Sequence, residues 1–260
     1  MNLKSYKELK KKQQYETRLE FSTYRDSCHG CLRSKKVCLC SNISAFATNA
    51  HIHILMHPKE ARKERVGTGR MCSLSLKNSE ISVGENFDDH PKIQKLLADN
   101  SYYPLLLYPG ENSHNIYQRP LDKSATSGKT LLIFVIDGTW SCAKKMMKSS
   151  KILHSLPRIS FPPKFRSKFD IKQQPEKFCV STIESVYYLL EGLNLWDHEN
   201  LNGEHLQLTK LLSLLVKQQI DFASNPSIGG YRRNSYKDPS ARTKFSTSKR
   251  NIVFEATNSQ

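Results

Sequence analysis

Six consecutive apolar residues, Leu131 to Ile136, lie near the middle of this 260-residue chain. A strand inside a parallel sheet is covered on both faces, so it carries apolar side chains in an unbroken run instead of at alternate positions. The run stops at Asp137-Gly138, and a helical pattern follows over residues 141–150. Because a buried strand that leads into a helix is typical of α/β proteins, we expect an α/β fold built on a mostly parallel sheet.

The rest of the chain alternates between short apolar runs and helical patterns. Strands are predicted at residues 51–56, 105–108 and 178–180, and helices at 88–99, 183–193 and 203–223, with a short helix that begins at Leu74. Ser181 and Glu184 form the pattern of a capping box, in which both side chains bind amide groups at the start of a helix. Residues 59–70 are predicted to be a basic loop with a turn at Gly67-Thr68-Gly69.

The charge of the chain is +16, and the excess is concentrated in residues 1–40, 144–172 and 226–250, which carry +6, +8 and +6. Such local concentration favours binding to nucleic acid over three merely solvated surfaces. A membrane surface is less favoured, because no strongly amphipathic basic helix is present. We expect one domain at 27–225, between a basic N-terminal segment at 1–26 and a basic, mobile tail at 226–260.

The apolar runs are far too short to span a bilayer, and the N-terminus lacks the apolar stretch of a secretory signal. We therefore expect a cytoplasmic protein without a membrane partner.

Four of the seven cysteines fall within thirteen residues, at Cys28, Cys31, Cys38 and Cys40. Two closely spaced pairs joined by a short loop can supply four thiolates to one tetrahedral zinc ion. Disulfides are less favoured because nothing marks the chain as secreted, and a redox Cys-x-x-Cys would leave the second pair unexplained. We expect a structural zinc knuckle at 28–40, with Gly30 providing its tight turn.

Three of the predicted strands end in loops that carry polar or glycine-rich sequences, which are His57–Glu60 with Gly67–Arg70, Tyr108–Ser113 and Asp137–Trp140. Ligands of open α/β sheets bind at the carboxyl ends of the strands. Asp137 is a candidate for proton transfer, and Trp140 is a candidate for stacking on a base. The alternative is that Asp137 caps the next helix and Trp140 lies in the core. His51 and His53 are interpreted as ordinary strand histidines.

Several of these segments resemble the DTW-domain family. The signature run of that family is matched by Asp137-Gly138-Thr139-Trp140 with Ala143–Met146 behind it, and a second motif by Gln174-Pro175 followed by Cys179–Glu184. The cysteine cluster, His57-Pro58-Lys59-Glu60, Gly67–Arg70 and Leu107–Gly110 occur in the order that the family shows. The resemblance runs from about residue 27 to residue 222. Gly138 stands at a variable position of the signature.

The resemblance implies a tRNA-uridine aminocarboxypropyltransferase, which transfers the 3-amino-3-carboxypropyl group of S-adenosylmethionine to N3 of a tRNA uridine and releases methylthioadenosine. It also implies an architecture similar to the SPOUT-like α/β methyltransferases, a class that includes knotted chains. The alternatives are a SPOUT-type RNA methyltransferase and a non-catalytic zinc-knuckle RNA-binding protein, with ribosomal RNA as a further alternative substrate.

The resemblance also implies roles for individual residues. The expected catalytic residues are Asp137 as the base, Thr139 and Trp140. The expected cofactor-binding residues are Gly67, Thr68, Gly69, Tyr108, Pro109, Gly110, Ser181, Thr182 and Glu184, although Glu184 is equally explained by the capping box. The basic side chains expected to contact RNA are Arg62, Lys63, Arg65, Arg70, Lys144, Lys145 and Lys148.

Overall fold

The computed structural model describes residues 27–63, 67–162, 167 and 179–224. The predicted N-terminal segment and tail, Arg65 and Gln174-Pro175 lie outside these residues. Within them, six strands form one sheet in which all pairs are parallel, in the order β2-β1-β5-β3-β6-β4. The strands are β1 His51–Met56, β2 Ser79–Val83, β3 Tyr102–Leu107, β4 His114–Asn115, β5 Thr130–Asp137 and β6 Arg158–Ser160. The prediction of an α/β fold with a parallel sheet is confirmed.

The unbroken apolar run forms β5, the strand between β1 and β3. Its side chains alternate between two cores. Leu131, Ile133 and Val135 pack on one face of the sheet, and Leu132 and Phe134 pack on the other. Burial on both faces is the reason for the missing polar alternation.

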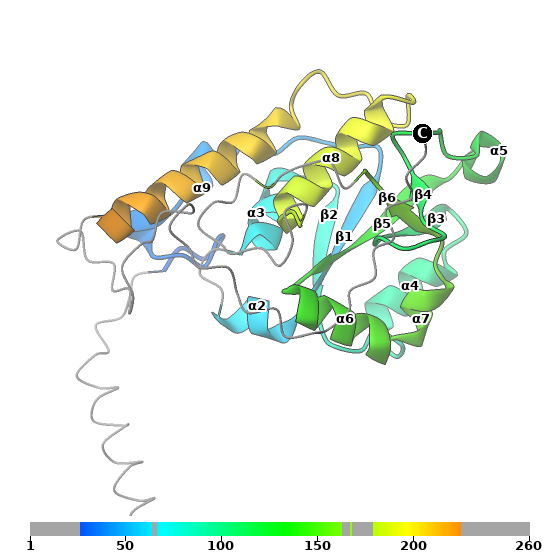
Figure 1. Ribbon diagram of the computed structural model, residues 1–260, viewed down its shortest axis with the longest axis horizontal. Coiled ribbons are helices and arrows are strands. Elements are labelled where there is room, and N and C mark those ends of the chain that lie inside the picture. Colours follow the sequence, from blue (N-terminus) through cyan, green and yellow to red (C-terminus); the bar gives the residue numbers. More distant parts are fainter. Residues whose placement is uncertain (1–26, 64–66, 163–166, 168–178, 225–260) are drawn as a thin grey trace, which may run out of the picture.

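Helices cover both faces of the sheet (Figure 1). On one face lie α3 Thr68–Ser75, α8 Thr182–Asn194 and α9 Leu206–Ser224, and on the other α4 Pro91–Ala98, α6 Trp140–Ser149 and α7 Lys151–Ser155. The remaining helices are α2 Pro58–Lys63 after β1 and the short α5 Lys123–Thr126. The helices predicted at 88–99, 141–150, 183–193 and 203–223 are therefore confirmed as α4, α6, α8 and α9, with boundaries that differ by a few residues.

Three sequence predictions are wrong. Residues 59–63 and 68–70 are not a loop, because they belong to α2 and to the start of α3, and Leu74 lies near the end of α3 instead of opening a helix. Two glycines at 67 and 69 suggested a turn, whereas Gly67 is the N-cap of α3 and Gly69 lies in its first turn. Cys179 and Val180 form no strand but lead into α8.

Strand β2 gave no clear signal in the sequence. It is an edge strand that pairs with β1, and three of its five residues, Ser79, Glu80 and Ser82, are polar. Strands β4 and β6 are only two and three residues long, which is too short for a recognisable pattern.

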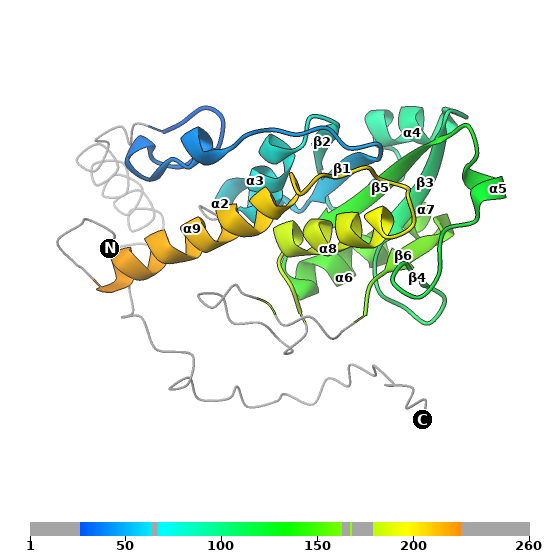
Figure 2. The ribbon, with the colours of Figure 1, turned by 90° about the horizontal axis from the view of Figure 1, so that it is seen from above.

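The cysteine segment packs beside the C-terminal half of α9 (Figure 2). Cys31 and Leu39 are buried in the same core as the apolar residues of α9, and the Arg33 guanidinium donates a hydrogen bond to Gln218 Oε1 at 3.0 Å. Two 3-10 turns, η1 Lys35–Val37 and η2 Cys40–Asn42, complete the segment. The knuckle is thus joined to the main domain by shared core packing.

Candidate functional site

The candidate site begins where β1 and β5 end side by side. Met56 is paired with Asp137 in the sheet, and the amide of His57 donates to the Asp137 carbonyl at 2.9 Å. The Asp137 side chain is buried, with 4% of the residue exposed. This places the expected catalytic carboxylate at the carboxyl edge of the central strand, where ligands of open α/β sheets bind.

The Asp137 carboxylate is held between the starts of two helices. Thr182, the first residue of α8, donates from Oγ1 to Asp137 Oδ1 at 2.6 Å. On the α3 side, a Cβ atom added to Gly69 would lie 2.4 Å from Asp137 Oδ2, so a larger residue has no room there. Helix N-termini carry partial positive charge, which favours a carboxylate at this position.

Thr139 and Trp140 follow Asp137 at the start of α6. Thr139 is the N-cap of α6, and its Oγ1 accepts from the amide of Cys142 at 3.3 Å. The alternative in which Asp137 caps this helix is therefore wrong. Trp140 is only half-buried, and the centroid of its ring lies 6.4 Å from that of Tyr108. Gly138 lies close to the same helix, since a Cβ there would lie 3.1 Å from Cys142 Cβ.

The loop after β3 approaches Trp140 through the ring of Tyr108. The Arg158 guanidinium stands over the Tyr108 ring at 5.7 Å from its centroid, and a Cβ on Gly110 would lie 2.9 Å from Arg158 Nη1. Burial raises the pKa of Tyr108, so its phenol is neutral at physiological pH. Pro109 and Gly110 are exposed. The structure therefore brings residues 137–140 and the Tyr108–Gly110 loop together.

The predicted capping box at the start of α8 is confirmed. Glu184 Oε2 accepts from the Ser181 amide at 2.8 Å and from Ser181 Oγ at 2.6 Å, and it also accepts from Ser167 Oγ at 2.8 Å. Glu184 is buried, with 2% of the residue exposed. These three donors give Glu184 a structural role at the helix that carries Thr182.

A polar chain beside the site was missed by sequence reasoning. Buried His57 places Nε2 3.1 Å from Glu85 Oε1, and Glu85 Oε2 lies 2.5 Å from Lys145 Nζ on α6. The amide of Lys59 donates to His57 Nδ1, which leaves Nε2 as the protonated nitrogen of the neutral ring. Burial lowers the pKa of His57. Glu85 follows β2, the strand without a sequence signal.

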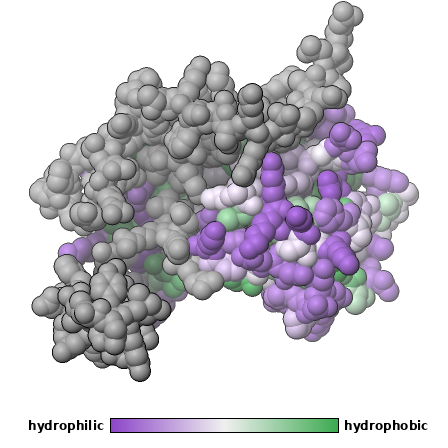
Figure 3. Space-filling model, turned by 60° about the horizontal axis from the view of Figure 1, so that its bottom comes forward, coloured by the Kyte–Doolittle hydropathy of each residue, from purple (hydrophilic) through white to green (hydrophobic). Residues whose placement is uncertain are grey.

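Six of the seven cations expected to contact RNA lie in described helices, which are α2 for Arg62 and Lys63, α3 for Arg70, and α6 for Lys144, Lys145 and Lys148. Lys144, Lys145 and Lys148 are exposed on α6, which begins at Trp140. The side of the molecule on which α6 lies is mostly hydrophilic over its described residues (Figure 3). Arg70 is half-buried on α3. The α6 lysines therefore extend from the candidate site along one helix.

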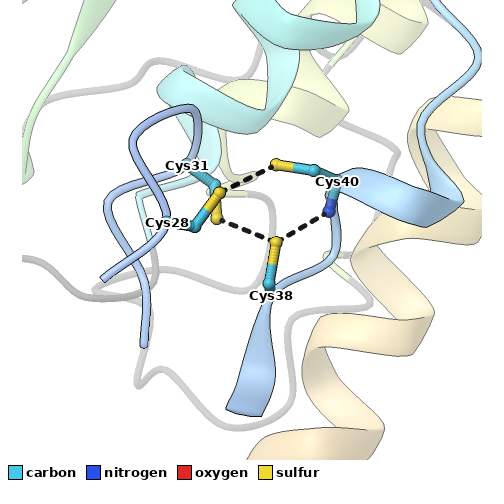
Figure 4. Close-up of side chains that lie close together, drawn as sticks. All are labelled: Cys28, Cys31, Cys38 and Cys40. Atoms are coloured by element: carbon cyan, nitrogen blue, oxygen red, sulfur yellow. Dashed lines mark hydrogen bonds between the residues drawn. The ribbon is translucent and has the colours of Figure 1, made fainter. Parts of the chain in front are cut away.

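The four clustered cysteines converge on one point (Figure 4). All four sulfur atoms lie within 4.8 Å of one another, with 3.7 Å between the sulfurs of Cys28 and Cys40 and 3.7 Å between those of Cys31 and Cys38. A tetrahedral ion with four thiolates at about 2.3 Å requires sulfur separations of about 3.8 Å. The donor set and its spacing therefore fit a tetrahedral metal, and the separations exclude disulfides between these two pairs.

The backbone of the cysteine segment is shaped to keep the sulfurs close. A Cβ on Gly30 would lie 3.4 Å from Cys40 Sγ, which is an ordinary contact, so Gly30 lies directly against the cluster. Gly30 lies in the turn as predicted, but the left-handed residue is Leu32, with φ of 56°. Hydrogen bonds led by the Cys31 amide lower the pKa of Cys28 to about 6, which favours a thiolate.

No helix in the described ranges is long and apolar enough to cross a membrane.

Comparison with known proteins gives a consistent family. A family model described as the DTW domain matches residues 25–220. A Drosophila melanogaster protein named tRNA-uridine aminocarboxypropyltransferase 2 is 31% identical over 204 residues, which is 76% of this chain and 76% of that protein. An Arabidopsis thaliana protein named tRNA-uridine aminocarboxypropyltransferase A is 25% identical over 226 residues, covering 77% of this chain and 81% of that protein.

A Macaca fascicularis protein named tRNA-uridine aminocarboxypropyltransferase 2 is 27% identical over 173 residues, covering 65% of this chain. The match spans only 57% of that relative's length. No solved structure matches the chain with significance. The family model covers well over half of the sequence, from the first knuckle cysteine to the last turns of α9, and the chain therefore belongs to the DTW-domain family.

Proposed function

We propose that this protein is a tRNA-uridine aminocarboxypropyltransferase, which transfers the 3-amino-3-carboxypropyl group of S-adenosylmethionine to N3 of a tRNA uridine. The relatives from fruit fly, macaque and Arabidopsis are named for this activity, which supports the assignment. The observation that carries it is the Asp137 carboxylate, fixed by Thr182 and seated against Gly69 beside the half-buried ring of Trp140.

Asp137 is the base in this proposal. Uridine N3–H is a weak acid, so a positioned carboxylate that removes its proton increases the nucleophilicity of N3. The N3–carbon bond forms as the carbon–sulfur bond breaks, and methylthioadenosine leaves with the bonding electron pair. Thr182 orients the carboxylate through its hydrogen bond, and Trp140 provides a stacking surface for the base. Positioning selects which of the three carbons on sulfur is attacked.

S-adenosylmethionine supplies the electrophilic carbon beside its sulfonium. The residues present fit its parts. Gly67, the N-cap of α3, has no side chain that could bind the amides of the first turn, which includes Thr68 and Gly69, and amides at a helix N-terminus suit an anionic carboxylate. Tyr108 and Trp140 offer aromatic faces, and Pro109-Gly110 are exposed next to them. At α8, by contrast, Ser181 and Glu184 form an internal cap. We therefore assign donor binding to the first turn of α3 and the Tyr108–Gly110 loop, and positioning of Asp137 to Thr182.

The cysteine cluster is proposed to hold one structural zinc ion. Four thiolates complete its coordination sphere and leave no position for a reacting water. The sulfur separations described above support this ion. Quantitative metal analysis of the purified protein is expected to give zinc, and Cys31→Ser is expected to lose it together with stability. A protein that stays folded, active and metal-free would contradict the assignment.

The SPOUT-like architecture implied by the sequence is also proposed. It is supported by the parallel strand order, in which β1 and β2 lie on one side of β5 and β3 and β6 on the other. The knot stays a prediction of the resemblance.

The experiment that tests the function combines product analysis with a binding measurement. Purified protein is incubated with unmodified tRNA and S-adenosylmethionine, and the nucleosides are analysed by mass spectrometry. We expect a uridine with the aminocarboxypropyl mass and release of methylthioadenosine. A methyl mass with S-adenosylhomocysteine would instead identify an RNA methyltransferase. Product on ribosomal RNA alone would reassign the substrate.

Asp137→Asn separates an enzyme from an RNA-binding protein. The amide retains the size of the carboxylate but cannot act as the base, so turnover is expected to fall by about 100-fold or more. Affinity for tRNA, measured by filter binding, is expected to change little. A wild-type protein that binds tRNA but yields no product with any RNA would support the non-catalytic alternative.

A further inference from the structure

A second group of metal-ligating side chains lies away from both the candidate site and the cysteine cluster. It consists of His51 and His53 on β1 and Glu80 on β2, and their nearest ligand atoms all lie within 4.8 Å of one another. His53 is paired with Glu80 in the sheet, and His51 shares a face of β1 with His53 because side chains alternate along a strand. Glu80 Oε2 lies 4.0 Å from His51 Nε2 and 3.8 Å from His53 Nδ1.

Two nitrogen atoms in this group have no hydrogen-bond partner among the described residues. Among the described residues, His51 Nε2 and His53 Nδ1 are buried without a hydrogen bond, and His53 itself is fully buried. Buried ring nitrogens normally have a hydrogen-bond partner, so two buried nitrogens that lack one beside the same carboxylate require an explanation. A bound cation would satisfy both nitrogens at once.

Other contacts hold His53 in the orientation that a ligand needs. Its second ring nitrogen, Nε2, lies 2.9 Å from Ser82 Oγ, and its ring packs against Phe134. When Ser82 Oγ accepts a hydrogen bond from the protonated Nε2, Nδ1 carries the lone pair on the side of Glu80. Metal-binding histidines commonly place their second nitrogen on a polar partner in this way.

We propose that His51, His53 and Glu80 form a binding site for a divalent transition-metal ion of the zinc type. Two imidazoles and one carboxylate are a ligand set typical of zinc. Bond lengths of about 2.0 to 2.2 Å require ligand separations of about 3.4 Å in a tetrahedral site. The ligand atoms therefore have to approach one another by about 0.4 to 1.4 Å through side-chain rotation.

The site is distinct from the two already described. His51 begins β1 and His57 follows its end, so at about 3.3 Å per residue His51 lies about 20 Å and His53 about 13 Å from the Asp137 end. It lies at the opposite end of the strands from the proposed catalytic residues. An ion here would connect β1 with the edge strand β2, which is a stabilising role rather than a catalytic one.

Lys92 on α4 competes with the ion. Its Nζ lies 2.5 Å from Glu80 Oε2, and its side chain is about half exposed, so it is able to swing into solvent. The ammonium group balances the Glu80 charge when no metal is bound. Metal binding therefore displaces Lys92, and removal of this lysine is expected to strengthen binding.

The test uses full-length protein without a histidine tag, with its cysteine site already loaded with zinc. Zinc chloride is titrated calorimetrically, and bound zinc is quantified after dialysis. We expect one further equivalent in the wild-type protein. Lys92→Met is expected to bind it about tenfold more tightly, and Glu80→Gln is expected to abolish it. His51→Gln should weaken binding at least tenfold.

Thermal unfolding provides a second readout. Lys92→Met leaves the β-sheet ligands intact, and zinc is expected to raise its melting temperature while leaving that of Glu80→Gln unchanged. Lys95→Met, on the same helix, is the matched control and should bind as the wild type does. A second equivalent that persists in Glu80→Gln would overturn the proposal, and so would its absence from both the wild type and Lys92→Met.

Discussion

Gly69 has no side chain, and the Asp137 carboxylate occupies the space where one would lie. Glycine is less favourable than alanine in a helix, so Gly69 is a locally unfavourable choice even in the first turn of α3. The close approach to Asp137 explains why glycine is present. The absence of a side chain at Gly69 allows α3 to pack closely against the carboxylate at the end of β5.

Gly69→Ala is therefore expected to be destabilising and to reduce turnover at least tenfold, because the new methyl group displaces the carboxylate. In an Asp137→Ala background the clash is absent, and Gly69→Ala should become neutral or stabilise by up to about 1 kcal/mol. Urea unfolding of the four proteins in this cycle measures the coupling. Equal effects in both backgrounds would show that Gly69 does not make room for Asp137.

Leu32 adopts a left-handed conformation although its side chain is about half exposed. A residue with a Cβ atom pays about 1–2 kcal/mol for this conformation, and glycine does not. Leu32→Gly is expected to stabilise the protein by up to about 1 kcal/mol in thermal unfolding, once the greater freedom of glycine in the unfolded chain is subtracted. Leu32→Ala removes the same side chain but keeps the strain, so it is the matched control and should not stabilise.

At the scale of an element, α8 joins the capping box to the reacting carboxylate. Glu184 accepts hydrogen bonds at the helix start, and Thr182 in the same turn donates to Asp137. Loss of a cap residue costs about 0.5–2 kcal/mol, and the buried Ser181 groups left without an acceptor add to this cost.

Glu184→Ala is expected to lower the free energy of unfolding by about 1–3 kcal/mol and to reduce activity through misplacement of Thr182. Glu184→Gln retains an acceptor oxygen and should keep most of the stability and most of the turnover. Chemical unfolding and steady-state kinetics on both variants separate the two explanations of this residue. A Gln variant that is stable but has a greatly raised KM for S-adenosylmethionine would favour direct contact with the donor.

At the scale of the whole molecule, the positive charge of α6 extends from the candidate site across an exposed surface. Each phosphate that a lysine neutralises contributes close to one unit to the salt dependence of binding. All three lysines of α6 are exposed, and Lys145 is the one that is paired with Glu85 among the described residues.

The double variant K144A/K148A is therefore expected to weaken tRNA binding and to lower the slope of log affinity against log salt by about two. Lys123→Ala on α5, at the other end of the sheet, is the control and should leave the slope unchanged. Filter binding over a range of salt concentrations gives both values. An unaltered slope in the double variant would exclude α6 from the RNA contact surface.

The sequence by itself determined the elements whose causes are local. Burial on both faces of β5 leaves an unbroken apolar run, the capping box places its partners three residues apart, and the knuckle cysteines are separated by at most twelve residues. In each case the interacting groups are close in the chain, so a pattern of residue types is sufficient to reveal them.

Only the tertiary structure decided which distant residues meet. Asp137 contacts Thr182 across 45 positions, Gly69 reaches it from a helix that resembled a turn, and Glu80 faces His53 from an edge strand with a polar sequence. These contacts depend on the strand order and on which helix packs at each strand end. The periodicity of apolar residues along the chain reveals neither of these. A short polar strand such as β2 becomes stable only when β1 provides its hydrogen-bonding partner.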